Sequence, residues 1–127
     1  MRAIKFRAWH KPSHKMSSPD LISPSGDCWN WSENYTGEMD YVTHEYELMQ
    51  FTGLLDKNGK EIYESDVVSQ YDWVGKENYS TIQWNQARCG FYLYKNDEPH
   101  LELADYRSIV VIGNLYENPE YCKGIAK

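Results

Sequence analysis

The chain has 127 residues, of which 41% are hydrophobic and 25% are charged, and its formal net charge is −6. A chain of this length is expected to fold as one domain with a single principal core, and the composition excludes a disordered protein. No stretch approaches the roughly 20 apolar residues that a membrane span requires, and charges interrupt the first residues where a signal peptide is apolar. We therefore expect a cytoplasmic protein that does not enter a membrane.

The charge is distributed unevenly along the chain. Residues 1–16 contain no acidic side chain and carry +5, which leaves −11 for the remaining 111 residues. The basic residues at the N-terminus form a candidate basic patch: Arg2, Lys5, Arg7, Lys11 and Lys15. A mainly acidic surface repels a phosphate backbone, so the net charge disfavours nucleic acid as a partner. The simpler interpretation is that these side chains form the solvated face of one strand.

The first 40 residues predict a strand, a hairpin return and a loop. Ile4, Phe6 and Ala8 recur with a period of two, which predicts a half-buried strand with these three side chains on its inner face. Turn residues follow, and they allow a short hairpin return around Met16. Residues 20–40 combine many turn residues with little alternation, so we predict a loop insertion held in place by its tryptophans.

The middle of the chain predicts two tight turns between short strands. Residues 41–52 are expected to form a strand, with a helix over residues 38–50 as the alternative. Asn58-Gly59 tolerates positive φ angles, and it predicts a polar turn between apolar segments that end at Leu55 and begin at Ile62. Residues 64–66 predict a second turn.

The second half predicts strands at intervals of about ten residues, a spacing typical of a small barrel or sandwich. The expected strands cover residues 67–71, 80–84, 90–94 and 108–112. The last of these is a continuous apolar run from Ile109 to Ile112, which predicts a central strand covered on both faces. Asn118 and Pro119 favour a helical turn that ends at Cys122.

Three blocks of sequence, in order along the chain, carry a family resemblance. They are residues 4–9 (IKFRAW), residues 49–68 (MQFTGLLDKNGKEIYESDVV) and residues 111–120 (VIGNLYENPE). Together they resemble the YopX-like proteins, a family of small phage and prophage proteins. The middle block departs from the family pattern at Ser65, where that pattern usually has glycine before the aspartate.

The resemblance implies a mainly β fold and one YopX-like domain over residues 1–127. Residues 1–47 would form N-terminal strands and the Trp-containing loop, and residues 48–122 would form a small SH3-like barrel. The resemblance implies no activity for any residue. Three strong blocks can be explained by folding alone, because each carries apolar strand positions and two contain turn glycines.

Candidate metal sites are weak in this sequence. His10, His14 and Cys28 have zinc-ligand chemistry, but no fourth ligand follows at a recognisable spacing. The turn at residues 56–59 has glycine at its fourth position, whereas a calcium loop has it at the sixth. We predict no metal and no cofactor.

Candidate catalytic groups are weak as well. Cys89 follows Arg88, and a cation stabilises a thiolate, but packing in a strand is the simpler role for this thiol. The carboxylates of Glu61, Glu64 and Asp66 could serve acid and base chemistry on a sugar, although solvated turns usually carry such residues. We therefore predict no catalytic residue and no enzyme.

Aromatic residues are the clearest anomaly, with five Trp and eleven Tyr against three Phe. Trp84 is predicted to lie in the core, and four rings are predicted to bind a partner: Trp9, Tyr63, Trp73 and Tyr94. The alternative is that the rings fill the core and seal contacts between subunits. We expect a non-enzymatic phage or prophage accessory protein that binds a protein partner or forms a homo-oligomer. A nucleic-acid-binding protein that uses the basic patch is the second hypothesis, and a small enzyme is the third.

Overall fold

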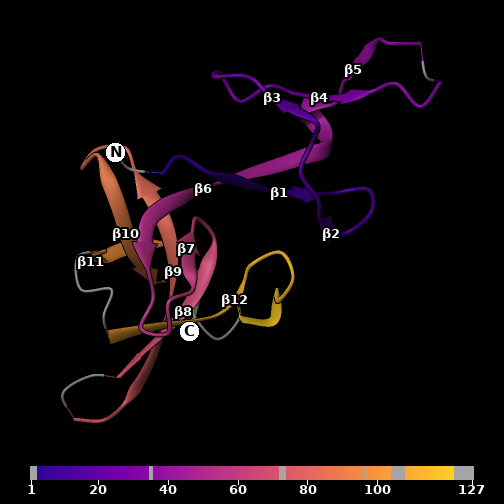
Figure 1. Ribbon diagram of the computed structural model, residues 1–127. Coiled ribbons are helices and arrows are strands. Elements are labelled where there is room, and N and C mark those ends of the chain that lie inside the picture. Colours follow the sequence, from indigo (N-terminus) through magenta and orange to yellow (C-terminus); the bar gives the residue numbers. More distant parts are fainter. Residues whose placement is uncertain (1–2, 35, 72–73, 96, 104–107, 122–127) are drawn as a thin grey trace. The chain divides into compact units, whose positions relative to one another are not determined.

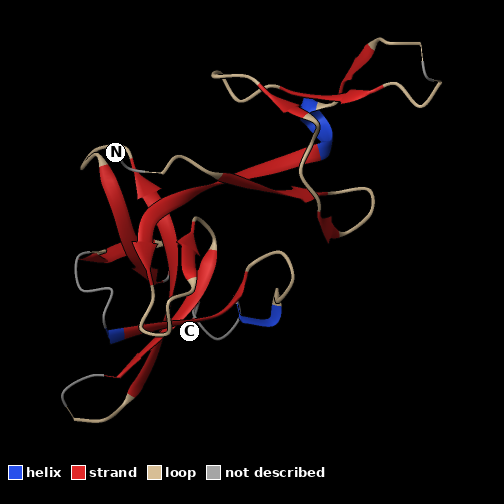
Figure 2. Cartoon of the chain, in the orientation of Figure 1, coloured by secondary structure: helices blue, strands red, loops and turns tan. Residues whose placement is uncertain are grey.

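The computed structural model describes residues 3–34, 36–71, 74–95, 97–103 and 108–121 (Figure 1). The fold is mainly β, as predicted, and strands dominate the cartoon in Figure 2. The chain divides into two compact units, one of residues 6–49 and the other of residues 1–5 with residues 50–127. Each unit has its own cluster of buried apolar side chains, whereas the length of the chain predicted a single principal core.

The first strand of the chain, β1 (Phe6–His10), forms the predicted hairpin return with β2 (Lys15–Met16). Its inner face differs from the prediction, because Ile4 is 71% exposed and Phe6 is 43% exposed. Instead the adjacent residues Ala8 and Trp9 are both buried. Ala8 joins the core cluster of this unit, and the ring of His14 in the following turn packs edge-on against Trp9. The strand is therefore covered on both faces, which a simple alternation does not reveal.

Residues 20–41 form a three-stranded antiparallel sheet, so the predicted loop is wrong. The strands are β3 (Leu21–Ile22), β4 (Cys28–Trp31) and β5 (Met39–Tyr41), with β4 in the centre (Figure 1). The turn residues that suggested a loop lie between the strands, where Gly26 has a φ of 90° and donates a hydrogen bond to the Ser23 carbonyl. Strands of two to four residues are too short to show a clear period of two.

The alternative helix over residues 38–50 is also absent. The chain passes from β5 through the short 3-10 helix η1 (Thr43–Glu45) into β6 (Tyr46–Leu55). The core of the first unit consists of Ala8, Cys28, Val42 and Tyr46, with Ile22 and Leu48 packed against it. The inner face of the three-stranded sheet supplies Ile22 and Cys28 to this cluster.

The second unit contains a five-stranded antiparallel sheet with the order β11-β10-β9-β8-β12. Its strands are β8 (Asp66–Tyr71), β9 (Glu77–Asn85), β10 (Gly90–Lys95), β11 (Glu98–Glu102) and β12 (Ile109–Asn114). Four of the five were predicted. β11 was missed, because Pro99 interrupts a short segment of mixed polarity. The core of this unit contains Ile62, Val68, Ile82, Leu93, Leu103, Ile109 and Val111.

The apolar strand β12 lies at the end of the sheet order, so the prediction that it is central is wrong. It pairs with β8, and Ile109 and Val111 are buried while Val110 and Ile112 are only half-buried. The hydrogen-bonding edge of β12 that faces away from β8 is covered by the turn at residues 56–60. There Lys57 donates its backbone N–H to the Ile109 carbonyl. A turn therefore takes the place that a further strand would occupy.

Asp56 holds that turn in place. One carboxylate oxygen accepts the backbone N–H groups of Asn58 and Lys60, each at 2.8 Å, and the other accepts that of Val111 at 2.9 Å. Asp56 is 7% exposed. Burial by itself would raise the pKa of Asp56, but the three backbone hydrogen bonds outweigh it and the pKa falls below its usual range. The turn has the predicted form, with Gly59 at a φ of 83°.

The second predicted turn, at residues 64–66, follows β7 (Glu61–Tyr63) and is equally well connected. Ser65 adopts a φ of 68°, donates its N–H to the Ile82 carbonyl and accepts from Leu115. Asp66 is buried and accepts the N–H of Tyr63 at 2.8 Å. The predicted helical turn after Asn118 extends toward Cys122, which lies outside the described residues.

Replacing Asp56 by asparagine should destabilise the fold by about 2–4 kcal/mol. Hydrogen bonds to a charged acceptor contribute roughly 1.5–3 kcal/mol each, and an asparagine amide would place a donor opposite a backbone N–H. Chemical denaturation of Asp56→Asn measures the change, with Glu120→Gln as an exposed control. Because the pKa of Asp56 is lowered in the folded state, its contribution is present above the unfolded pKa of about 4 and is lost as the pH falls through the folded pKa. The variant should therefore lose less stability than the wild type between pH 5 and 2, and an equal loss would contradict this role.

Replacing Ser65 by glycine should stabilise the protein by up to about 1 kcal/mol. A left-handed backbone costs an L-residue about 1–2 kcal/mol, and the greater freedom of glycine in the unfolded chain cancels part of the gain. Thermal unfolding should show a higher midpoint for Ser65→Gly. Ser65→Ala keeps the Cβ atom and should show no gain; a rise in both variants would assign the effect to the hydroxyl group instead.

Candidate functional site

One face of the three-stranded sheet carries a row of large apolar side chains. Trp29 and Trp31 are two residues apart in β4, so both project from the same face of the sheet. The strand register places Leu21 and Tyr41 beside Trp29, and Met39 beside Trp31. We call these five residues the aromatic face: Leu21, Trp29, Trp31, Met39 and Tyr41.

The aromatic face is open to solvent. Trp31 is 60% exposed, Tyr41 57% and Leu21 48%, while Trp29 and Met39 are half-buried. The Trp29 and Tyr41 rings meet edge to face at 5.7 Å, and Tyr41 donates its hydroxyl to Asp27 at 3.1 Å. The opposite face of the sheet packs on the core of its unit, so the strands hold these rings outward. Contiguous apolar surface of this kind typically marks an interaction site.

The segment that carries this face is strongly acidic. Residues 17–48 contain seven Asp and Glu residues and no Lys or Arg. Glu33 and Glu38 line a hollow of about 650 Å³ with Trp31, and no Lys or Arg belongs to its described lining. A negative potential near exposed rings favours cations and repels phosphate groups.

A second hollow, of about 590 Å³, lies on the inner side of the same strands and also reaches Trp31. We call it the polar pocket. Asn30 is central to it, donating to the Tyr46 hydroxyl at 3.0 Å and accepting from the Asp20 backbone at 2.9 Å. Asp40 is the cross-strand neighbour of Asn30 in β5. These hydrogen bonds keep the lining of the pocket in one arrangement.

His10 and Glu45 complete the polar pocket. The His10 Nε2 atom lies 3.5 Å from a Glu45 oxygen, its Nδ1 atom lies 2.7 Å from the Ser13 hydroxyl, and its ring packs on Tyr46 at 4.8 Å. His10 therefore acts as a support within the unit. His14, which the zinc hypothesis grouped with it, packs on Trp9 instead. Across the described residues there is no group of three or more His, Cys, Asp or Glu side chains that could hold a metal.

The described rings among the four predicted to bind a partner are buried or half-buried within their own units. Trp9 is buried, and Tyr63 and Tyr94 are half-buried. Tyr63 donates its hydroxyl to Glu61, and the Tyr94 hydroxyl accepts a hydrogen bond from Asn85. Trp73 lies outside the described residues. The rings that are gathered on one exposed surface are those of β4 and β5, which belong to the segment predicted as a loop.

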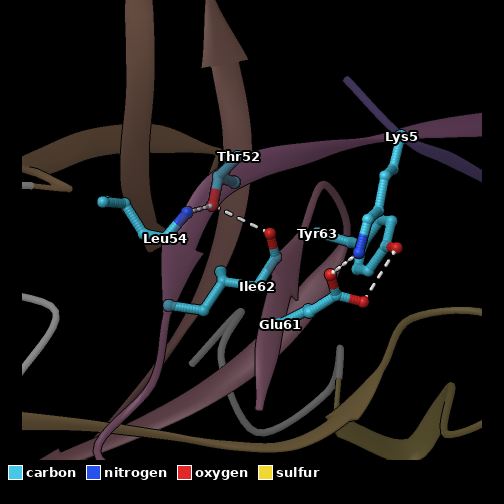
Figure 3. A network of polar contacts seen from close by, with 6 residues as sticks. All are labelled: Lys5, Thr52, Leu54, Glu61, Ile62 and Tyr63. Atoms are coloured by element: carbon cyan, nitrogen blue, oxygen red, sulfur yellow. Dashed lines mark hydrogen bonds and ion pairs between the residues drawn. The ribbon is translucent and has the colours of Figure 1, made fainter. Parts of the chain in front are cut away.

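Lys5 shows how the basic residues are used. Its ammonium pairs with Glu61, which also accepts from Tyr63 (Figure 3). The ammonium also lies 5.5 Å from the centre of the Phe51 ring. The hydrogen bond with Glu61 raises the pKa of Lys5, and the same bond lowers the pKa of Glu61. Figure 3 also shows Thr52, whose buried hydroxyl donates to the Ile62 carbonyl and ties β6 to β7.

The other members of the basic patch are similarly placed on the fold. Arg7 is half-buried and donates to the Met49 sulfur at 3.4 Å, and Lys11 pairs with Glu47 at 3.0 Å. Lys15 is exposed in β2, and Arg2 lies outside the described residues. Lys5 belongs to one unit and the other three described residues to the other. Lys5 and Lys11 therefore each have a carboxylate partner within their own unit.

Trp84 and Cys89 differ from their predictions. Trp84 is 42% exposed, although it shares a strand face with the fully buried Ile82. It lies near the end of β9, beyond the core, where its ring contacts Phe91 edge-on at 5.1 Å. Cys89 is exposed with a φ of 50° in the turn between β9 and β10, so it does not pack in a strand.

The predicted carboxylate group is occupied by structural contacts. Asp66 accepts from Tyr63, Glu61 pairs with Lys5, and Glu64 accepts the N–H of Gln50 at 2.7 Å.

Burial raises the pKa of the Cys28 thiol, which belongs to the core of the first unit. Within the described part of the chain, no helix has the length and apolar character needed to cross a membrane.

The fold and this surface define a small, mainly β protein with an exposed aromatic face. Residues 5–123 match the family described as YopX protein, and the chain therefore belongs to the YopX family. Its structure is similar to the crystal structure of protein EF1440 from Enterococcus faecalis. The two have a TM-score of 0.63 and 26% sequence identity, over 96% of this chain and 99% of that chain. No curated protein matches the chain.

Replacing Trp31 by alanine should leave the free energy of unfolding within about 0.5 kcal/mol of the wild type. Substitutions of exposed side chains away from buried networks usually have effects of this size. The measurement is urea denaturation followed by circular dichroism, with Tyr46→Ala as a buried comparison that should lose about 3 kcal/mol or more. A large loss in Trp31→Ala would show that the ring serves the fold.

Proposed function

We propose that this protein is a non-enzymatic binding module that docks a segment of another protein on its aromatic face. The observation that carries the proposal is the exposed row of Trp31, Tyr41 and Leu21 on a sheet whose other face supplies Ile22 and Cys28 to the core. Aromatic residues dominate the energetics of protein interfaces because they bury much area with few rotatable bonds. An exposed row of them on a supported sheet is a ready-made docking surface.

The charge of this surface favours a different protein as the occupant over a nucleic acid or a second copy of the chain. Seven acidic residues in positions 17–48 would repel a phosphate backbone. A symmetric dimer through this face would place two acidic surfaces against each other, because an isologous contact pairs each patch with itself. A second, different protein chain avoids both penalties.

The remainder of the molecule has the role of a scaffold in this proposal. The antiparallel order β11-β10-β9-β8-β12, closed on one side by the Asp56 turn, supports assigning the second unit to the SH3-like barrels. The resemblance to phage and prophage proteins supports an accessory role inside a bacterial cytoplasm. Each carboxylate of the group that the sequence suggested for acid and base chemistry has a structural partner, which supports a non-enzymatic role.

The test is a set of peptides selected from a random displayed library against the wild-type protein. Their binding to the double variant Trp31→Ala, Tyr41→Ala should fall by at least about tenfold, because central interface aromatics each contribute about 1–2 kcal/mol or more. Trp84→Ala is the matched control, since this exposed tryptophan belongs to the other unit. It should bind the peptides like the wild type.

Three results would contradict the proposal. The first is equal binding of the peptides to the double variant and the wild type. The second is a multimer by light scattering that becomes a monomer in the double variant, because the occupant would then be a second copy. The third is oligonucleotide binding at about 50 mM salt that is lost at about 200 mM and does not depend on Trp31 or Tyr41.

A further inference from the structure

The surroundings of Trp31 differ from those of an ordinary apolar patch. This ring borders both hollows of the first unit, the one lined by Glu33 and Glu38 and the polar pocket lined by Asp20 and Asp40. The described lining of the two hollows contains no Lys or Arg. A ligand that covers the Trp31 ring therefore has the carboxylates of Glu33 and Glu38 available in the same hollow.

The carboxylates near Trp31 differ in whether they already have a partner within the protein. Asp20 already accepts the Trp31 backbone N–H at 2.9 Å, and Glu45 faces His10. Glu33 and Glu38 are exposed, and their carboxylates accept no hydrogen bond from the described residues. The two carboxylates that share a hollow with the open Trp31 ring can thus be neutralised by an incoming cation.

We infer that the segment docked on the aromatic face is basic, and that one of its arginine side chains stacks on Trp31 and pairs with Glu33 or Glu38. This inference rests on the proposed function and specifies its partner. A guanidinium is planar, stacks on aromatic rings, and presents a fork of donors to carboxylates, whereas an ammonium offers a compact, strongly hydrated charge. The flat Trp31 ring and the carboxylates beside it therefore match a guanidinium better than an ammonium.

Charge complementarity also explains why the rings can remain exposed in the free protein. A purely apolar sheet face invites association with copies of itself, and like charges around it oppose that contact. The same charges raise the rate of encounter with a basic segment. The acidic surroundings therefore select the partner as well as protecting the surface.

The test uses three fluorescein-labelled peptides of one sequence that differ at two positions, which hold arginine, lysine or citrulline. Citrulline keeps the planar shape of arginine and removes its charge. Fluorescence anisotropy at about 0.01 M and about 0.15 M ionic strength measures binding to the wild type, because screening weakens exposed charge pairs over this range. The arginine peptide should bind with the highest affinity, and citrulline should weaken binding by roughly tenfold or more at low salt, as expected for charge-assisted hydrogen bonds.

Two sets of protein variants separate the contributions. The variant Glu33→Gln, Glu38→Gln should lose about tenfold for the arginine peptide and little for the citrulline peptide. The control Glu98→Gln, Glu120→Gln removes two exposed charges from the other unit and should bind like the wild type. Trp31→Ala should weaken the arginine and lysine peptides, and the loss should be larger for arginine.

The outcomes distinguish this inference from the proposed function. Equal binding of the citrulline and arginine peptides, with both lost in Trp31→Ala, would overturn the inference and leave the docking face in place. Binding of no arginine peptide at millimolar concentration, while library-selected peptides bind the aromatic face, would do the same. Peptide binding that is indifferent to Trp31→Ala and to the variant Glu33→Gln, Glu38→Gln would overturn both.

Discussion

The buried carboxylate of Asp56 is the interaction on which the second unit depends. It gathers three backbone N–H groups, two from its own turn and one from β12, and so fixes a turn against the last strand of the sheet. Asn114 at the end of β12 acts similarly by accepting from Tyr116 and Glu117. These residues lie in the two longer blocks that carry the YopX resemblance. The blocks thus describe a set of backbone connections, and their strength as a pattern reports on folding rather than on a site.

Many of the described Trp and Tyr side chains lie at or near the surface. The core of the second unit is aliphatic, built from residues such as Ile62, Ile82 and Val68, with Phe91 packed beside it. Trp31 and Tyr41 are exposed in the first unit, and Trp84 and Tyr71 in the second. The surplus of Trp and Tyr over Phe fits this distribution, because both residues combine a large apolar surface with a polar group that tolerates water.

Local turn chemistry was the most predictable part of the fold. Asn58-Gly59 located the first turn, and the spacing of turn residues located four of the five strands in the second unit. Pairing between distant segments was not predictable, so β12 was placed in the centre and Trp84 in the core. The aromatic face was missed for the same reason. The alternation Cys28-Trp29-Asn30-Trp31 contains its signal, but only the register with β3 and β5 shows that Leu21, Met39 and Tyr41 lie beside the tryptophans. Ion pairs between residues far apart in the sequence, such as that of Lys5 with Glu61, could not be predicted either.

The separation between supporting and exposed faces of the small sheet has a consequence for how such a protein diversifies. Cys28 and Asn30 alternate with Trp29 and Trp31 in β4. Neighbouring positions of this short strand therefore serve either the interior of the unit or its exposed face. The inward positions are constrained by the core, whereas the outward ones can be replaced singly at little expense in stability. A lineage under pressure to follow a changing partner could therefore alter its recognition residues one at a time while the Asp56 turn and the sheet behind it stay the same. Changes in recognition would then be concentrated on the outer face of β3, β4 and β5.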